Sequence, residues 1–221
     1  MTGVTVRALD SSPSILPLYA KAAAPMIPGA SKLPFLPGGG GEIPEDLALE
    51  LAGVTAEPAD VAAYAKVCGF TLRDTLPPTY PHVLAFPLHM ALMSAGSFPF
   101  GAVGLVHVEN RIVQHRQIAI DEELTIRVRP TALQPHPKGQ TFSLRTEVLV
   151  GAETAWSSES TMLRRGNPGS NADAPAMRDK VRSSEVVRVP EGVPEVGPAS
   201  AEWKLGGDLG RRYAGVSGDR N

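Results

Sequence analysis

The sequence predicts an α+β fold, in which a curved antiparallel sheet wraps around one buried helix. Three observations predict it. Four strand-like runs follow one another between residues 104 and 163. Apolar and polar residues alternate in them with a period of two, which is typical of strands with one buried face. A short and almost uniformly apolar segment comes before these runs, and its composition favours a helix buried by the sheet.

Length and charge exclude some classes of protein. The chain has 221 residues, enough for one large domain or two small ones, and a net charge of -2. This weak acidity argues against a nucleic-acid partner. The only cysteine, Cys68, has no partner for an internal disulfide. A chain without disulfides fits a reducing compartment, and we expect the cytoplasm.

The N-terminal part, residues 1–46, is expected to be an irregular arm that packs on the folded body. Residues 15–28 are apolar enough to suggest a signal peptide or a membrane anchor. Pro17, Lys21 and Pro25 interrupt this stretch, however, so it falls short of the roughly 18 apolar residues that a membrane-spanning helix needs. We therefore expect no membrane partner.

The next elements are a strand and two helices. Residues 47–54 have the composition of a first strand. Glu57, Pro58 and Asp60 are typical of the start of a helix, which Gly69 is expected to end. The apolar run at residues 88–93 then predicts a short buried helix within residues 87–95.

The four strands of the sheet are expected to be joined by tight turns. Glycine and proline at residues 135–139 and 151–152 supply two of these turns. Leu124, Ile126 and Val128 illustrate the alternation, since polar residues separate them. The predicted strand runs are residues 104–118, 122–133, 139–150 and 153–163.

Composition changes again after the sheet. Residues 166–200 are rich in proline, glycine, serine and charge, so we expect a linker. Leu209, Tyr213 and Val216 then predict an amphipathic helix, which so short a tail is not expected to bury by itself. The predicted division is therefore an arm at 1–46, a domain at 47–165, the linker at 166–200 and the start of a second domain at 201–221.

The tail carries a motif. It resembles the signature Y-[AG]-x-x-S-G-D-x-N-P-x-H of the MaoC-like (R)-specific enoyl-thioester hydratases and 3-hydroxyacyl-thioester dehydratases. Tyr213, Ser217, Gly218, Asp219 and Asn221 match it in register, and Ala214 fills its second position. The stretches LPPTYPHVLAFPLHMAL, FPFGAVGLVHVENRI and VQHRQIAIDEEL resemble the N-terminal half of double-hotdog members of that family.

The resemblance implies a hotdog fold and a hydro-lyase acting on an acyl thioester of coenzyme A or of acyl-carrier protein, with no cofactor and no metal. Asp219 corresponds to the family's catalytic carboxylate, and Asn221 to a substrate-binding position. The family's catalytic histidine would follow Asn221, where the sequence ends. We therefore expect a chain truncated within its second hotdog and inactive alone, which pairs as a homodimer or with a complementary hotdog domain. The side chains expected to line the acyl pocket are Tyr80, Phe86, Leu88, Met90 and Leu92.

Other polar residues have simpler interpretations. His107, Glu109 and His115 could suggest a metal site, but polar residues on the surface of a sheet fit their spacing better. His82 and His89 are interpreted as core or pocket-lining histidines rather than as a catalytic dyad. The glycines at 38–41 lack the lysine and hydroxyl residue of a phosphate loop, so a flexible loop is expected.

Two alternative functions stay open. The chain could be a non-catalytic acyl-binding or scaffold subunit that a partner chain completes. It could also be a hotdog thioesterase, which would need a water-activating group near the buried helix. Residues 87–97 contain no aspartate or glutamate, so the thioesterase is the weaker alternative.

Overall fold

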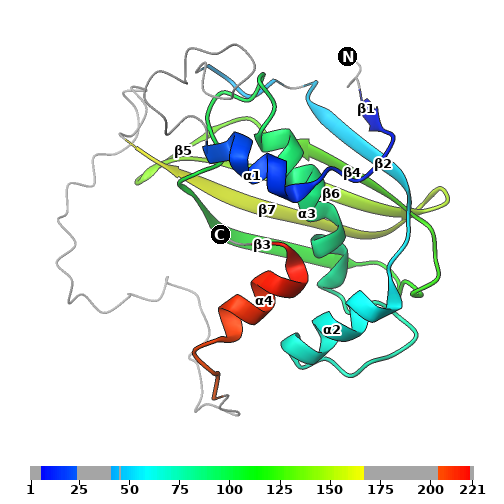
Figure 1. Cartoon of the computed structure of the whole chain (residues 1–221). Helices are drawn as coiled ribbons and strands as arrows, with labels where there is room; N and C mark the ends of the chain where they lie inside the picture. The colour runs from blue at the N-terminus through cyan, green and yellow to red at the C-terminus, as the bar shows by residue number, and fades with distance from the viewer. Residues whose placement is uncertain (1–5, 24–40, 45, 167–203, 220–221) are drawn as a thin grey trace, which may run out of the picture.

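The described residues form four helices and one curved sheet in the computed structural model of the protein, and α3 (Tyr80–Met93) is the helix that packs on the sheet (Figure 1). The structure describes residues 6–23, 41–44, 46–166 and 204–219. The helices are α1 (Ile15–Ala23), α2 (Pro58–Cys68), α3 (Tyr80–Met93) and α4 (Leu209–Ser217). The strands are β1 (Val6–Leu9), β2 (Ala48–Val54), β3 (Leu105–Gln114), β4 (Leu124–Pro130), β5 (Gln134–His136), β6 (Gly139–Val150) and β7 (Glu153–Arg165).

The sheet has the strand order β1-β2-β4-β6-β7-β3, and β5 pairs with β6. β1 runs parallel to β2, whereas the other pairs are antiparallel. The antiparallel sheet predicted for residues 104–163 is confirmed. β6 and β7 are long strands joined by a tight turn at Gly151, which has a φ of 57°. The order leaves β3 at one edge, without a second neighbour among the described strands.

The helix α3 lies in the hollow of the sheet and forms the centre of the core (Figure 1). Leu124, Ile126 and Val128 of β4 are buried and alternate with more exposed residues, as the period of two predicts. Leu88 and Leu92 of α3 are both 0% exposed. Apolar side chains of the helix and of the inner sheet face therefore form one core, which hydrophobic burial stabilises.

The start of α3 differs from the prediction. The helix begins at Tyr80 and continues through Pro87, so the helix expected within residues 87–95 is wrong at its N-terminal end. A proline inside a helix lacks one backbone donor and usually marks a helix start, which is why the sequence favoured a later beginning. Trp156 Nε1 donates a 2.7 Å hydrogen bond to Pro78 O and anchors the segment just before the helix.

The N-terminal arm is more regular than expected. It contains β1, which extends the sheet, and α1, which packs beside α3. The expectation of an irregular arm is therefore wrong for residues 6–9 and 15–23. Leu18 and Tyr19 of α1 pack against the core, and this tertiary contact outweighs the low helix propensity of Pro17. The glycine run at 38–40 and the rest of the segment 24–40 lie outside the described residues.

The tail forms the expected helix, α4, and that prediction is confirmed. Its apolar face packs against the core of the same chain, contrary to expectation. Tyr213 and Val216 pack against the core, and the rings of Tyr213 and Tyr64 of α2 lie 6.2 Å apart. The linker expected at 166–200 lies almost wholly outside the described residues, so the division into domains stays a prediction.

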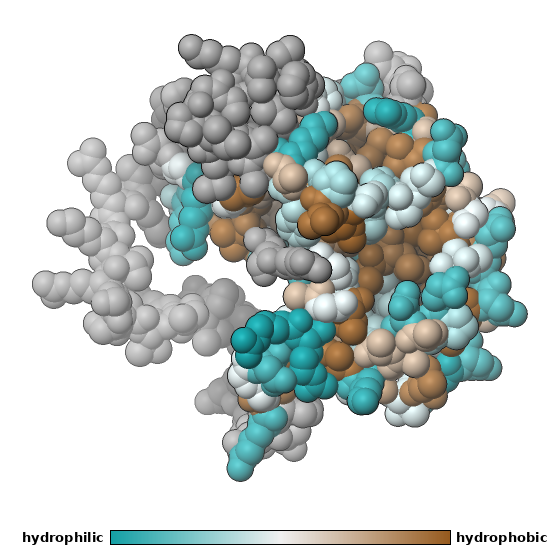
Figure 2. Space-filling model, viewed as in Figure 1, coloured by the Kyte–Doolittle hydropathy of each residue, from teal (hydrophilic) through white to brown (hydrophobic). Residues whose placement is uncertain are grey.

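Hydrophobic side chains gather in the middle of the face that carries the helices (Figure 2). Teal, hydrophilic residues surround them in this view. None of the helices that the structure describes is long and apolar enough to cross a membrane.

Candidate active site at the end of α4

Asp219 follows a backbone turn that two hydrogen bonds hold in place. Gly218 ends α4 with a φ of 73°, a left-handed conformation that favours glycine. A Cβ at this position would lie 2.8 Å from Ile15 Cδ1 of α1. The hydroxyl of Tyr19 donates to Gly218 O at 3.3 Å, and the backbone N–H of Asp219 donates to Ser217 Oγ at 3.1 Å. The arm and α4 together therefore position the carboxylate.

Three histidines of α3 and β3 form a cluster. The rings of His82 and His89, two turns apart on α3, have centroids 5.3 Å apart. The ring of His107, on the edge strand β3, stacks on that of His82 at 6.0 Å. His89 Nε2 and Thr146 Oγ1 are 2.7 Å apart in a buried hydrogen bond, which anchors the inner end of the cluster on β6.

Burial keeps two of these histidines uncharged. It lowers the pKa of His82 to about 4, with a further lowering by His107 and an opposing effect of the Asp219 carboxylate. Burial also lowers the pKa of His89 well below its ordinary value, and the neighbouring His82 and His107 add to this. His82 and His89 are therefore neutral at pH 7.

The tyrosines near this end of the fold are held in their protonated form. Burial raises the pKa of Tyr80 to about 12, and the charges of Asp60 and Glu57 act in the same direction. Burial also raises the pKa of Tyr213, with smaller contributions from Cys68 and Asp219. These hydroxyls can donate or accept hydrogen bonds at pH 7, but they carry no charge.

The side chains expected to line an acyl pocket lie on α3, and most of them are core residues. Tyr80, Leu88, Met90 and Leu92 are buried, whereas Phe86 is partly exposed and packs against the core. Their burial is that of core residues, and their role in an acyl pocket stays a prediction. Asn221, the other expected binding residue, lies outside the described residues.

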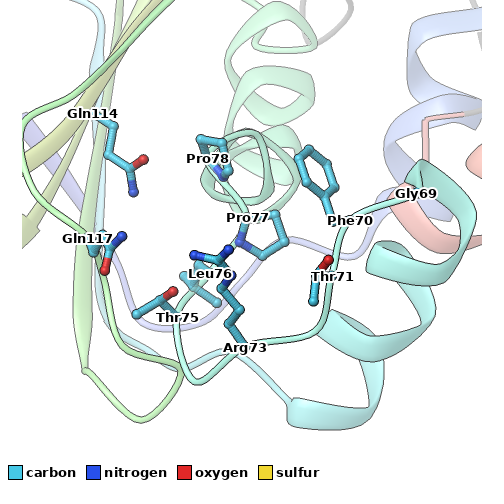
Figure 3. Close-up of a pocket in the computed structure, with 10 residues that line it drawn as sticks. All are labelled: Gly69, Phe70, Thr71, Arg73, Thr75, Leu76, Pro77, Pro78, Gln114 and Gln117. Carbon is cyan, nitrogen blue, oxygen red and sulfur yellow. The ribbon is translucent and has the colours of Figure 1, made fainter.

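An open pocket of about 360 Å³ lies elsewhere, between the loop from α2 to α3 and the end of β3 (Figure 3). Arg73 and Gln114 extend toward its centre, and the ring of Phe70 stands at its rim. None of the expected acyl-pocket residues lines it. The full lining is Gly69, Phe70, Thr71, Arg73, Thr75, Leu76, Pro77, Pro78, Gln114 and Gln117.

The described residues include no group of three or more His, Cys, Asp or Glu side chains that could hold a metal ion. His107 and Glu109 are exposed on β3, with a bulge in the strand pairing between them. His115 lies farther along, 3.1 Å from Ser157 Oγ. This arrangement is that of polar residues on a sheet surface.

The spacing of two histidines in the sequence indicates part of this cluster. His82 and His89 are seven residues apart, so a helix places both on one face. The interpretation of core or pocket-lining histidines matches their burial, but it did not connect them with Asp219. The structure packs α4, which precedes Asp219, against α2, and no local pattern predicts this packing.

A curved sheet wrapped around a central helix is the hotdog architecture, and comparisons with known proteins agree with it. The chain is 34% identical over 202 residues to 3-hydroxyacyl-thioester dehydratase X of Mycobacterium tuberculosis. That match covers 91% of this chain and 64% of the relative, so the chain spans less than two thirds of the relative's length. No family model matches the chain.

Solved structures show the same similarity. A crystal structure of HtdX from M. tuberculosis has a TM-score of 0.62 and 32% identity, covering 79% of this chain and 62% of that one. A MaoC-like dehydratase from Phytophthora capsici has a TM-score of 0.59 with the same coverage, and its 18% identity shows the fold alone. The chain therefore has the hotdog fold, and its sequence is similar to that of a 3-hydroxyacyl-thioester dehydratase.

Proposed function

We propose that this chain is the acyl-binding part of a hydro-lyase that interconverts trans-2-enoyl and 3-hydroxyacyl thioesters, and that it carries the catalytic carboxylate, Asp219. The observation that supports this most strongly is the 34% identity to a 3-hydroxyacyl-thioester dehydratase over 91% of the chain. The turn at Gly218, which holds the carboxylate of the family motif, supports it independently.

The proposed chemistry needs three things: a water at C3 of the enoyl group, a proton at C2, and a donor for the thioester oxygen as negative charge develops there. A carboxylate and an imidazole that are both hydrogen-bonded to one water can take a proton from that water and deliver a proton to C2. In the dehydration direction the same two groups remove the C2 proton and protonate the leaving hydroxyl. Asp219 is the carboxylate in this proposal, and the second hotdog unit supplies the imidazole and the oxyanion donor.

The acyl chain is proposed to run along α3. Phe86 is the partly exposed member of the five expected pocket residues, so we assign it direct contact with the acyl group. Tyr80, Leu88, Met90 and Leu92 support that wall from within the core. Asn221 is proposed to contact substrate as well, as its place in the motif implies.

The proposed partner is a second hotdog unit, either in a longer chain or on another chain. The strand β3 has no second neighbour among the strands that the structure describes, so its outer edge can pair with such a unit, and its Val108 and Val113 are 49% and 41% exposed. The carrier of the acyl group is coenzyme A or acyl-carrier protein.

Binding of an acyl ligand to this chain tests the proposed function. A non-hydrolysable 3-hydroxyacyl thioether analogue of coenzyme A, titrated into the chain and followed by NMR, is expected to shift resonances of Phe86 and of residues near Asp219. Shifts confined to the pocket around Arg73 would contradict the proposed path of the acyl group. The matched variant Phe86→Ala should weaken binding more than Phe70→Ala, which changes an exposed ring in that other pocket.

A further inference from the structure

Two arginines lie opposite each other on the outer face of the sheet. Arg129 of β4 and Arg145 of β6 are direct partners in the strand register, so their side chains lie on the same face. That face points away from the core, because Val128 and Leu144, which precede the two arginines, are buried. Like charges on directly opposite residues destabilise a sheet. An anion bound between them would offset this repulsion.

The carboxylates in this cross-strand row leave part of its positive charge uncompensated. Glu159 of β7 is the next residue of the row, and Arg145 Nε donates to its Oε2 at 3.3 Å. Arg111 of β3 is the register partner of Glu159 on its other side, so the row holds three arginines and one glutamate, a net charge of +2. Arg129 makes no ion pair with a carboxylate that the structure describes. The end of the row at Arg129 is therefore where a bound anion is most stabilising.

The neighbouring row of the same face has the opposite balance. Arg127 of β4, two residues before Arg129, forms an ion pair with Glu50 of β2. Its register partner on β6 is Glu147, so both of its cross-strand neighbours are acidic. The excess of positive charge thus belongs to the row of Arg129 and not to the sheet face as a whole.

An open pocket of about 290 Å³ lies at this end of the row. Arg129, Arg145 and Thr131 are its polar lining residues, and none of its lining residues is acidic. Thr131 Oγ1 accepts a 2.8 Å hydrogen bond from the backbone N–H of Ser143, which fixes its hydroxyl in the wall. The volume is close to the lower end for ligand pockets, about 300 Å³, and exceeds what a phosphate group alone would fill. The apolar lining residues are Ile43, Pro44, Pro130 and Ala132.

We propose that this pocket binds an organic phosphate monoester, with the phosphate between the guanidinium groups of Arg129 and Arg145 and the organic part against Pro44 and Pro130. Guanidinium groups bind phosphate oxygens through paired hydrogen bonds. A phosphate monoester carries a charge of about −1.5 to −2 at pH 7, which matches the net charge of the row better than a carboxylate does. The site does not depend on the proposed function, because it lies on the face of the sheet opposite α3.

The direct test is a titration of the 221-residue chain with phenyl phosphate, followed by nitrogen-15 NMR of the arginine Nε–H groups and the backbone. We expect shifts at Arg129, Arg145 and Thr131, and tighter binding than that of inorganic phosphate, because the ring lies against the prolines. Benzoate, with the same ring and one charge, should bind more weakly than phenyl phosphate. Equal affinities for the three ligands, or shifts centred on Arg164 and Arg165 at the end of β7, would overturn the proposal.

Variants of two exposed arginines give the second test, and both should fold because neither side chain is part of the core. Arg129→Gln should weaken binding of phenyl phosphate by roughly 10–100-fold, the loss expected for one hydrogen bond between charged groups. The matched control is Arg127→Gln, which removes the same charge from the same strand and face but from an arginine already paired with Glu50. Its effect on the affinity should be much smaller. Equal losses in the two variants would indicate diffuse attraction to positive charge and overturn the site.

Discussion

At the scale of single residues, Gly218 determines where Asp219 lies. A side chain at Gly218 would have to adopt a φ of 73° and would meet Ile15 Cδ1 at 2.8 Å. Gly218→Ala should therefore destabilise the fold by about 1–3 kcal/mol, the usual cost of a residue held in a sparsely populated conformation. Urea unfolding measures this difference.

The same helix provides a control. Gly215 has open space around its Cβ position and an ordinary helical conformation. Gly215→Ala should be stabilising by roughly 0.5–1 kcal/mol, because alanine favours a helix. Equal effects of the two substitutions would show that the turn at Gly218 does not hold α4 against α1.

His82 makes stability depend on pH. Burial lowers its pKa from 6.5 to about 4. Between pH 6.5 and pH 4, His82 is therefore protonated in the unfolded chain and neutral in the folded chain. The contribution is fully present above pH 6.5 and is lost as the pH falls toward 4. Between pH 7 and pH 5 we expect the protein to lose about 2 kcal/mol more unfolding free energy than His82→Gln does.

Urea unfolding of both proteins at the two pH values checks this. Carboxylates titrate in both proteins, so the comparison isolates His82. Parallel pH profiles would mean that His82 is accessible to protons in the folded state.

The helix α3 holds two kinds of apolar residue. Leu88 is 0% exposed, and truncating it leaves a cavity, so Leu88→Ala should cost about 2–5 kcal/mol. Phe86 is partly exposed, so Phe86→Ala should cost less stability and mainly weaken binding of an acyl ligand. Unfolding free energies and ligand titrations on both variants test the distinction. Similar losses of stability would place Phe86 in the core too.

At the scale of elements, β3 lies at one edge of the described sheet. It pairs with β7 on one side, and Val108 and Val113 are exposed large hydrophobic residues. We expect the chain alone to self-associate through this edge, because an unpaired strand accepts another strand. Val108→Lys should shift sedimentation toward the monomer, since a charge opposes such pairing.

Leu72→Lys is the control, because Leu72 is 59% exposed but lies on the loop between α2 and α3. If both lysine variants behave alike, general surface hydrophobicity rather than β3 drives association. A monomeric parent chain would contradict the expectation directly.

Much of the sheet could be predicted from the sequence, because the alternation that defines strands is local. The four long strands and the helix α2 with its cap at Gly69 were all predicted in place. The start of α3 was not, since Pro87 favoured a boundary that the packed core overrides. β1 was missed because four residues without a buried face give no periodic signal.

The candidate site was predictable only in part. The motif identified Asp219, because its neighbours in sequence carry the resemblance. The histidine cluster forms because β3 lies beside α3, and α4 joins the fold through its packing beside α2. Contacts between segments so far apart in sequence depend on tertiary structure, which the local pattern does not contain.

At the scale of the whole molecule, the described residues form one sheet with a shared core, and the chain spans 64% of its dehydratase relative. We therefore expect the catalytic residues to be divided between this chain and a second hotdog unit. Removing one member of a general acid–base pair typically costs about 10²–10⁴-fold in rate. Losing an oxyanion donor costs about 10²–10³-fold, although the two losses need not multiply.

The most direct test of this account is the rate of crotonyl-CoA hydration by a longer chain that continues through the second hotdog unit, with and without Asp219→Asn. The account predicts that the longer chain is active, that the 221-residue chain is not, and that Asp219→Asn lowers the longer chain's rate by about 10²–10⁴-fold while its circular dichroism spectrum stays unchanged. A longer chain that keeps its rate after Asp219→Asn, or a 221-residue chain as active as the longer one, would contradict it.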